Sequence, residues 1–299
     1  MTNAPSRHTS KLRSRAEAEA ARLPPLLAQA EQMAGTVLLG DHGRRRAGMG
    51  DDFWQYRPVQ TGDSYRMIDW RRSARSDAQY VREREWQVAQ SVMLWLDQGA
   101  SMQFASDEAL PSKMMRARVL ALAVSILLVR AGERVGLTGN RLPPRRGEAQ
   151  IARLTEAFLN EDASAAEGEY AAPDARAMLP HARAVFVSDF LGDIDGIWGA
   201  LTKAADRGVR GVLLQVLDPS EESFPFQGRT VFQSIGGGLS HETRKAGDLR
   251  DRYMTRLAER RDALDQLCRR TGWQFHSHTT GQSAQSALLW LYRALEQSR

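Results

Sequence analysis

Two aspartates occupy positions in this sequence where a carboxylate could bind a metal ion. Asp97 directly follows the apolar run 92–96 (VMLWL), and Asp189 follows the run 184–188 (AVFVS). Runs of this length that end in polar loops are typical of strands buried on both faces of a parallel sheet. Because parallel strands end at one edge of a sheet, and open α/β sheets bind ligands there, we expect the two carboxylates to lie close together.

Ser101, in the loop 97–101 (DQGAS), adds a third oxygen ligand. Mg²⁺ prefers oxygen ligands in near-octahedral geometry and usually keeps several waters, so Asp97, Ser101 and Asp189 could hold it as a cofactor. The alternative, which we favour, is that both aspartates accept hydrogen bonds from loop amides at the ends of their strands.

The order of the expected elements would position these residues. Strands are expected at 92–97, 134–138, 184–188, 209–217 and 273–277, and helices at 112–129, 148–160, 194–207, 245–271 and 283–297. Strand and helix alternate, which favours a parallel sheet covered by helices on both faces. The predicted fold class is therefore α/β, with a Rossmann-like domain at 90–299. Residues 230–235 are a further candidate edge strand.

The residues before this domain have a different composition. Residues 1–42 are expected to form a helical segment, with one helix at 11–22 and another from Pro25 to Met33, because Pro24-Pro25 must interrupt a single helix. Residues 43–89 are dense in Gly, Asp, Arg and aromatic side chains and show little helical or strand period. We expect a loop-rich segment that a network of Arg–Asp pairs stiffens.

The loop after the first strand resembles part of a known motif. The layout is similar to a von Willebrand factor A domain, whose metal-ion-dependent adhesion site reads Asp-x-Ser-x-Ser, with a later Thr and a later Asp. Asp97, Ser101 and Asp189 match this site, whereas Gly99 replaces the first Ser and Thr138 is a weak substitute for the Thr. The resemblance implies a partial, degenerate adhesion site.

A longer pattern precedes the first strand. It consists of Tyr56-Arg57, Gly62-Asp63, Arg66, Ile68-Asp69-Trp70, Ser73-Ala74-Arg75 and Val81-Arg82-Glu83. The pattern resembles the bacterial family called domain of unknown function 58, whose members carry a von Willebrand A-like domain and are commonly encoded beside MoxR-type AAA+ ATPases. The resemblance implies an accessory or adaptor role with such an ATPase and a client protein, in the assembly or maturation of protein complexes.

Eight residues of this pattern are candidates for binding a partner protein. They are Arg57, Asp63, Arg66, Asp69, Trp70, Arg71, Arg75 and Arg82. The other interpretation is structural, with the Arg–Asp network holding the segment together, and each exposed pair in such a network is weak. The sequence leaves both interpretations open.

Composition narrows the class of protein. The chain has 299 residues, a net charge of +5 and four lysines among its 41 basic residues. No stretch approaches the roughly 20 apolar residues of a membrane helix, and the N-terminus has no apolar run typical of a signal peptide. A single cysteine, Cys268, excludes an internal disulfide and is expected to be buried on the helix 245–271. We expect a cytoplasmic protein.

Sequence motifs of common enzymes are missing. The chain contains no GxxxxGK[ST], HExxH or GxSxG motif, so we expect a non-enzymatic protein-interaction module. His276 and His278 share one face of the last expected strand and are interpreted as edge-strand histidines. One alternative is a metal-dependent phosphoesterase that uses Asp97 and Asp189 with Asp51 or Asp52. Another is nucleic-acid binding through the arginines of residues 43–82, where nine Arg and five Asp leave a charge of only +4.

Overall fold

The chain forms two compact units. The computed structural model describes residues 23–37, 44–48, 52–61, 63–75, 78–138, 142–160, 168–173, 178–235, 238 and 240–297, so the helix expected at 11–22 lies outside the described residues. Contacts between Cα atoms group residues 1–40 with 91–299 as the larger unit and 41–90 as the smaller one. No helix in the described part of the chain is long and apolar enough to cross a membrane.

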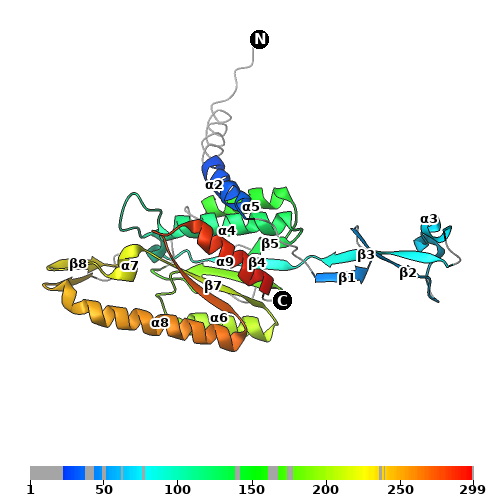
Figure 1. Ribbon diagram of the computed structural model, residues 1–299. Coiled ribbons are helices and arrows are strands. Elements are labelled where there is room, and N and C mark those ends of the chain that lie inside the picture. The colour runs from blue at the N-terminus through cyan, green and yellow to red at the C-terminus, as the bar shows by residue number, and fades with distance from the viewer. Residues whose placement is uncertain are drawn as a thin grey trace, which may run out of the picture. The chain divides into compact units, whose positions relative to one another are not determined.

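A five-stranded parallel sheet forms the centre of the larger unit (Figure 1). Its strands are β4 (Ser91–Leu96), β5 (Arg134–Leu137), β6 (Arg183–Ser188), β7 (Arg210–Leu217) and β10 (Gln274–Thr279), in the order β10-β7-β6-β4-β5. Every neighbouring pair is parallel. The chain winds from β4 outward to β5, and then from β6 outward to β7 and β10. β4 and β6 therefore flank the switch point at which open α/β sheets bind ligands.

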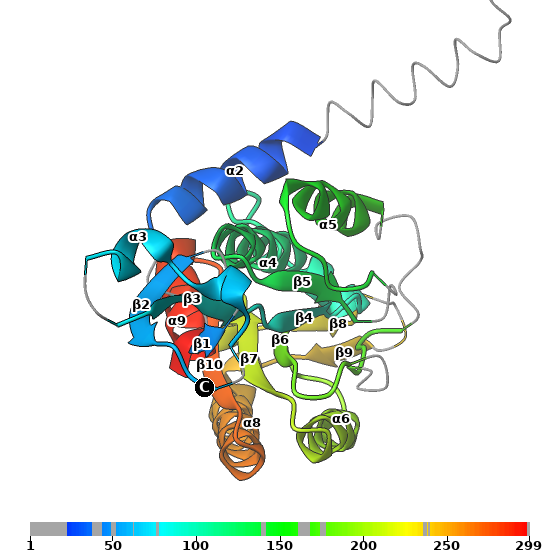
Figure 2. The same ribbon diagram turned by 90° about the vertical axis from the view of Figure 1, so that its right-hand side faces the viewer.

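Helices cover both faces of this sheet (Figure 2). On one face, α2 (Leu23–Gly35), α4 (Lys113–Arg130), α5 (Glu148–Asn160) and α9 (Ala284–Gln297) contribute to a shared apolar core. On the other face, α6 (Ile194–Asp206) and α8 (Arg250–Thr271) pack with Trp95, Phe186 and Trp273 in a second core. The predicted α/β class, with a parallel sheet between two helical layers, is confirmed.

Short elements lie around the carboxyl edge of the sheet. These are η2 (Ala100–Gln103), α7 (Pro219–Ser223), β8 (Thr230–Gln233), β9 (Ser240–Thr243) and η5 (Ala246–Leu249). The expected edge strand at 230–235 is present at residues 230–233, which pair antiparallel with β9 in a two-stranded sheet separate from the parallel one.

The smaller unit is a sheet, so the expectation of a loop-rich segment at 43–89 is wrong. β1 (Arg44–Gly48), β2 (Asp52–Pro58) and β3 (Tyr80–Val88) pair antiparallel in the order β1-β3-β2. The reason lies in residues such as Arg82 to Glu85 (RERE), which give a strand without apolar alternation. The connection between β2 and β3 carries η1 (Tyr65–Met67) and α3 (Trp70–Ser73).

Candidate functional site

Asp97 is buried at the end of β4, and both of its carboxylate oxygens accept hydrogen bonds. It is 1% exposed. Oδ1 accepts hydrogen bonds from the backbone N–H groups of Gly99 at 2.7 Å and Ala171 at 3.3 Å. Oδ2 accepts a hydrogen bond from the Ser188 hydroxyl at 2.6 Å. Asp97 thus joins the end of β4 to its own loop, to β6 and to residue 171.

Burial controls the charge of this carboxyl group. The pKa of Asp97 is raised to about 6, mainly because the group is removed from water and to a smaller extent because of the nearby charge of Asp189. The hydrogen bonds from Ser188, Gly99 and Ala171 oppose this rise because they favour the ionised form. The net direction shows that burial outweighs the three donors.

A short stretch that we term the covering segment, residues 168–171, lies against the Asp97 loop. Its carbonyl groups at 168 and 169 accept hydrogen bonds from the N–H groups of Ala100 at 3.2 Å and Ser101 at 3.0 Å. A Cβ atom added to Gly99 would lie 2.5 Å from the carbonyl oxygen of residue 169. The covering segment thus occupies the space that a serine side chain would need, which explains why the motif has glycine at position 99.

Asp189, at the end of β6, binds a buried lysine. Oδ2 accepts a hydrogen bond from the Lys113 ammonium at 2.9 Å, while Oδ1 accepts one from the N–H of Leu191 at 3.0 Å. The same ammonium donates to Oε1 of Glu221 at 2.6 Å. Burial lowers the pKa of Lys113, but the charges of Asp189 and Glu221 outweigh burial and raise it overall. Lys113 is therefore a charged group inside the protein.

Sequence reasoning missed Lys113 and Glu221. The one local signal is that Lys113 directly follows Ser112, the N-cap of α4. A cation in the first turn of a helix opposes the helix dipole, so its presence there calls for a specific partner. That partner cannot be read locally, because Asp189 and Glu221 lie 76 and 108 residues further along the chain.

The residues predicted to hold Mg²⁺ do not fit a divalent ion in this arrangement. Each carboxylate oxygen of Asp97 and Asp189 already accepts a hydrogen bond, one of them from an ammonium group. The Ser101 hydroxyl is buried and has no hydrogen-bond partner among the described residues. Thr138 donates its hydroxyl to the carbonyl of Leu94 at 3.2 Å. The described ranges contain no group of three or more His, Cys, Asp or Glu residues that could hold a metal ion.

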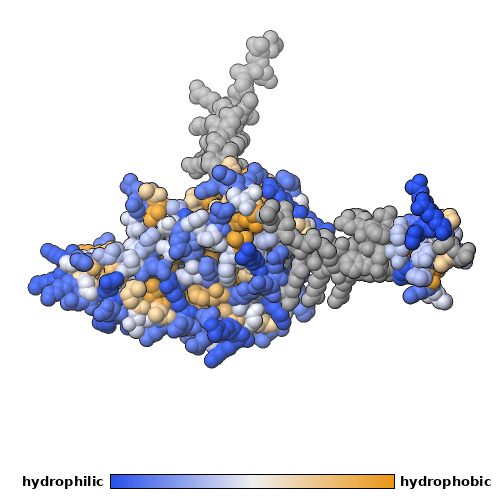
Figure 3. Space-filling view, viewed as in Figure 1, coloured by the Kyte–Doolittle hydropathy of each residue, from blue (hydrophilic) through white to orange (hydrophobic). Residues whose placement is uncertain are grey.

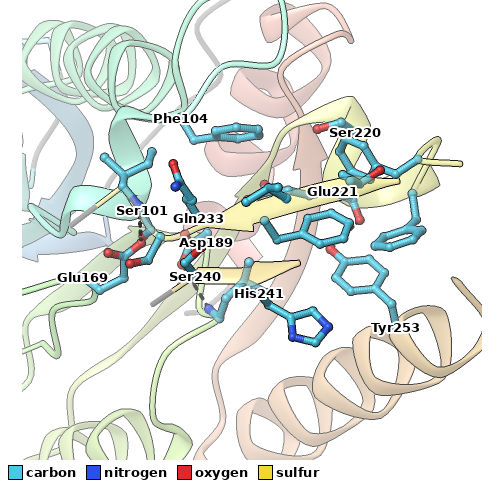
Figure 4. Close-up of a pocket in the computed structure, with 18 of the residues that line it drawn as sticks. Ser101, Phe104, Glu169, Asp189, Ser220, Glu221, Gln233, Ser240, His241 and Tyr253 are labelled. Atoms are coloured by element: carbon cyan, nitrogen blue, oxygen red, sulfur yellow. Dashed lines mark hydrogen bonds between the residues drawn. The ribbon is translucent and has the colours of Figure 1, made fainter. Parts of the chain in front are cut away.

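A pocket of about 770 Å³ opens beside this network. Figure 4 shows Ser101, Asp189 and Glu221 among its lining residues, with Phe104 and Tyr253 also on its wall. Four aromatic rings are grouped there: between ring centroids, Phe224 lies 5.3 Å from Phe226, 5.7 Å from Phe232 and 4.9 Å from Tyr253. Among the described residues that line the pocket, none is Lys or Arg. The pocket combines an aromatic wall with carboxylates.

Three of the eight predicted partner-binding residues hold the smaller unit together. The Arg57 guanidinium donates two hydrogen bonds of 2.7 Å to the carboxylate of Asp63. This contact, with the N–H of Gln60, lowers the pKa of Asp63 to about 2. Asp69 is the N-cap of α3, where its Oδ1 accepts from the N–H of Arg72 at 2.9 Å. These three side chains are structural.

Four of the remaining five are exposed to solvent. They are Arg66, Trp70, Arg71 and Arg75, and the side chain of Arg82 lies outside the described residues. Trp70 is 57% exposed and the neighbouring Tyr65 is 78% exposed. The two interpretations of the pattern therefore each describe part of it: some residues build the connection between β2 and β3, and others are displayed on it.

The two histidines and the cysteine singled out in the sequence are structural. β10 is an edge strand of the parallel sheet, as predicted for His276 and His278. His276 stacks on Trp290 at 4.7 Å between ring centroids, and His278 is buried with Nε2 3.2 Å from the Arg116 guanidinium. Cys268 is buried as predicted, and burial raises its pKa to about 12.

Known proteins resemble this chain over most of its length. Uncharacterized proteins of Mycobacterium bovis and Mycobacterium tuberculosis are each 29% identical to it over 264 residues, which cover 85% of this chain and 82% of theirs. An aerotolerance-related membrane protein from Bacteroides fragilis has a solved structure that matches with a TM-score of 0.47 at 17% identity, over 70% of this chain and 100% of that one. For the conserved hypothetical protein BatB from Bacteroides thetaiotaomicron the TM-score is 0.45 at 16% identity, over 70% and 98%.

The family is established by a match to the sequence itself. The sequence model of the family described as Protein of unknown function DUF58 matches residues 55–263 of this chain. This range begins within β2 and ends within α8, so it includes both the displayed residues around Trp70 and the Lys113 network. The chain therefore belongs to the DUF58 family of proteins of unknown function.

Proposed function

We propose that this chain is a non-enzymatic protein-interaction module that docks a partner through the exposed connection of its smaller unit. The observation that carries the proposal is the exposure of Trp70 and Tyr65 among arginines. We define the docking face as Tyr65, Arg66, Trp70, Arg71 and Arg75, all of which are exposed. Trp, Tyr and Arg are the residues most enriched at the energetic centres of protein interfaces.

The charge of the docking face indicates what kind of surface its partner should have. Its exposed arginines are Arg66, Arg71 and Arg75, whereas the nearby carboxylates of Asp63 and Asp69 are engaged by Arg57 and by the start of α3. The displayed charge is therefore positive. Figure 3, which shows hydropathy, places strongly hydrophilic residues beside hydrophobic ones at this end of the smaller unit. We expect an acidic surface on the partner, since complementary charge speeds and orients docking.

The partner that we propose is a MoxR-type AAA+ ATPase, with a client protein brought to it for assembly or maturation. This choice rests on what is implied by the family resemblance of the segment around Trp70. The same exposed aromatics and arginines could stack on bases of single-stranded nucleic acid. We favour a protein because aspartates alternate with arginines through residues 43–82, which leaves little net positive charge for a polyanion.

Affinity measurements on single variants test the docking face. Full-length wild type, Trp70→Ala and Arg71→Ala are compared for binding to the MoxR-type ATPase of the same organism by biolayer interferometry. Loss of a central aromatic anchor is expected to weaken binding by about tenfold or more. Trp198→Ala is a matched control, because Trp198 is also exposed and also lies beside an arginine, with Arg270 5.6 Å from its ring.

Each result decides between the candidate partners. Weak binding by Trp70→Ala with wild-type binding by Trp198→Ala supports the proposal. Equal binding by all variants would overturn it. If wild type does not bind the ATPase, but binds single-stranded DNA with an affinity that falls steeply as the salt concentration rises, the nucleic-acid alternative is favoured instead.

A further inference from the structure

We infer that the ammonium group of Lys113 is the resident cation of the sheet-edge site and stands in place of a divalent metal ion. In an adhesion-type site, a metal joins oxygen ligands from separate loops at this edge. Here the ammonium joins Asp189, at the end of β6, to Glu221 in α7, at 2.9 and 2.6 Å. This inference concerns the larger unit and does not depend on the docking face.

The contacts around Glu221 extend the network to the loop after β4. Oε2 of Glu221 accepts a hydrogen bond from the N–H of Asp218 at 2.8 Å, while Oδ2 of Asp218 accepts one from the N–H of Ser106 at 3.0 Å. The ammonium therefore links the start of α4, the end of β6 and α7 directly, and Asp218 extends the link to the loop after β4. A structural cation at this edge would link the same elements.

The burial of Lys113 indicates that its position is specific. The residue is 0% exposed, and burying an ammonium is strongly unfavourable unless carboxylates compensate it. The first turn of α4 adds to that cost because the helix dipole disfavours a cation there. The two ion pairs with Asp189 and Glu221 must therefore offset both the burial of the ammonium and its unfavourable position in the helix dipole.

The ammonium and a divalent ion exclude each other. Oδ1 of Asp189 already accepts the N–H of Leu191, so a divalent ion would compete with the ammonium for Oδ2, and two cations at one carboxylate in a buried site repel strongly. The buried Ser101 hydroxyl has no hydrogen-bond partner in the described structure. This is what we expect of a former metal-ligand oxygen at a site where the ammonium has replaced the metal ion. Because the ammonium is itself buried, it also offers no open position to a carboxylate of a partner.

Thermal unfolding and calorimetry with metal ions test the inference on the full chain. Wild type, Lys113→Ala and Lys203→Ala are stripped with a chelator and then titrated with Mg²⁺ or Mn²⁺. Wild type is expected to show neither binding nor a change in Tm. Lys113→Ala is expected to have a lower Tm, which the metal partly restores, because Asp189 and Glu221 are then free to bind an ion through two carboxylates and water. Lys203, an exposed lysine of α6, is the matched control, and its variant should behave as wild type.

A second comparison applies if Lys113→Ala does not fold. Lys113→Met should then also fail, while Lys113→Met combined with Asp189→Asn and Glu221→Gln should fold, because the carboxylates no longer need a cation. Saturable metal binding by wild type that Asp189→Asn abolishes would overturn the inference. The inference would also be overturned if Lys113→Ala folds but neither binds the metal ion nor gains Tm from it. The same holds if the triple variant is no more stable than Lys113→Met.

Discussion

The Ser188 hydroxyl donates a 2.6 Å hydrogen bond to Oδ2 of Asp97 and so connects the ends of two neighbouring parallel strands. The same hydroxyl oxygen accepts a hydrogen bond from the N–H of Phe190 at 2.9 Å. Asp97 is therefore held by donors from both strand ends, although burial raises its pKa to about 6. An asparagine at position 97 would remove the buried charge and keep an acceptor for the N–H groups of Gly99 and Ala171, while its Nδ2 would donate to the Ser188 oxygen instead of accepting from it.

Asp97→Asn is expected to be at least as stable as wild type at pH 7. The folded-state pKa of about 6 lies above the unfolded value of about 3.9, so the folded protein loses stability as pH rises through that interval. The asparagine should recover about 1–3 kcal/mol at pH 7 and less at pH 5. Asp97→Ala should instead lose about 1–3 kcal/mol, because the N–H groups of Gly99 and Ala171 then lack an acceptor. Urea unfolding at both pH values measures these differences, and a destabilised Asp97→Asn would contradict them.

Gly99→Ala is expected to destabilise the larger unit. The new Cβ would lie 2.5 Å from the carbonyl oxygen of residue 169 and 2.8 Å from the Cα of residue 170, and these are backbone atoms that cannot move aside easily. Overpacking of this kind costs about 1–3 kcal/mol. Gly199→Ala is the matched control, because nothing lies within 4 Å of a Cβ at this position in α6, and alanine there should stabilise the helix by up to about 1 kcal/mol. Opposite shifts in Tm are the expected result, and equal shifts would disprove the role of the covering segment.

His278 is expected to make stability fall in mild acid. Burial, followed by the charge of Arg116 and by His276, lowers its pKa to about 4, below the unfolded value of about 6.5. The unfolded chain therefore binds a proton first, and stability is lost as pH falls from about 6.5 toward 4. Asp97 has the opposite dependence, so the effect is measured in the Asp97→Asn background. There, His278→Phe should flatten the profile of Tm against pH between 4 and 6.5, and an unchanged slope would rule out His278 as its cause.

The sequence predicts the parallel sheet well because its strands are long apolar runs that must be buried on both faces. Residues 92–96 and 184–188 specify β4 and β6, and the alternation with helices specifies their direction. The same reasoning fails for the smaller unit. There, β3 contains a run of alternating charges. Its pairing is made by backbone hydrogen bonds, and the sequence of the strand shows no alternation of apolar and polar residues that would reveal it.

The site was only partly predictable for a different reason. Asp97 and Asp189 could be placed at one edge because each ends a recognisable strand. Lys113 and Glu221 lie in separate elements, and only the folded chain brings the ammonium to both carboxylates. The covering segment is likewise invisible in the sequence, since it contacts the Asp97 loop through its backbone carbonyls.

Asp69→Ala is expected to loosen the docking face without changing its exposed side chains. It removes the acceptor for the N–H of Arg72 and for the Tyr56 hydroxyl, which lie 2.9 and 3.3 Å from the carboxylate. Loss of a helix N-cap costs about 1 kcal/mol. Hydrogen exchange in residues 65–75 should therefore become faster in Asp69→Ala.

Trp70→Ala provides the contrast, because its side chain is largely exposed and its loss should leave exchange in residues 65–75 as in wild type. Both variants should then bind the partner more weakly, one through loss of order and the other through loss of a contact. Faster exchange in Trp70→Ala would mean that Trp70 supports the fold of the smaller unit, and exchange unchanged in Asp69→Ala would mean that the cap does not order α3.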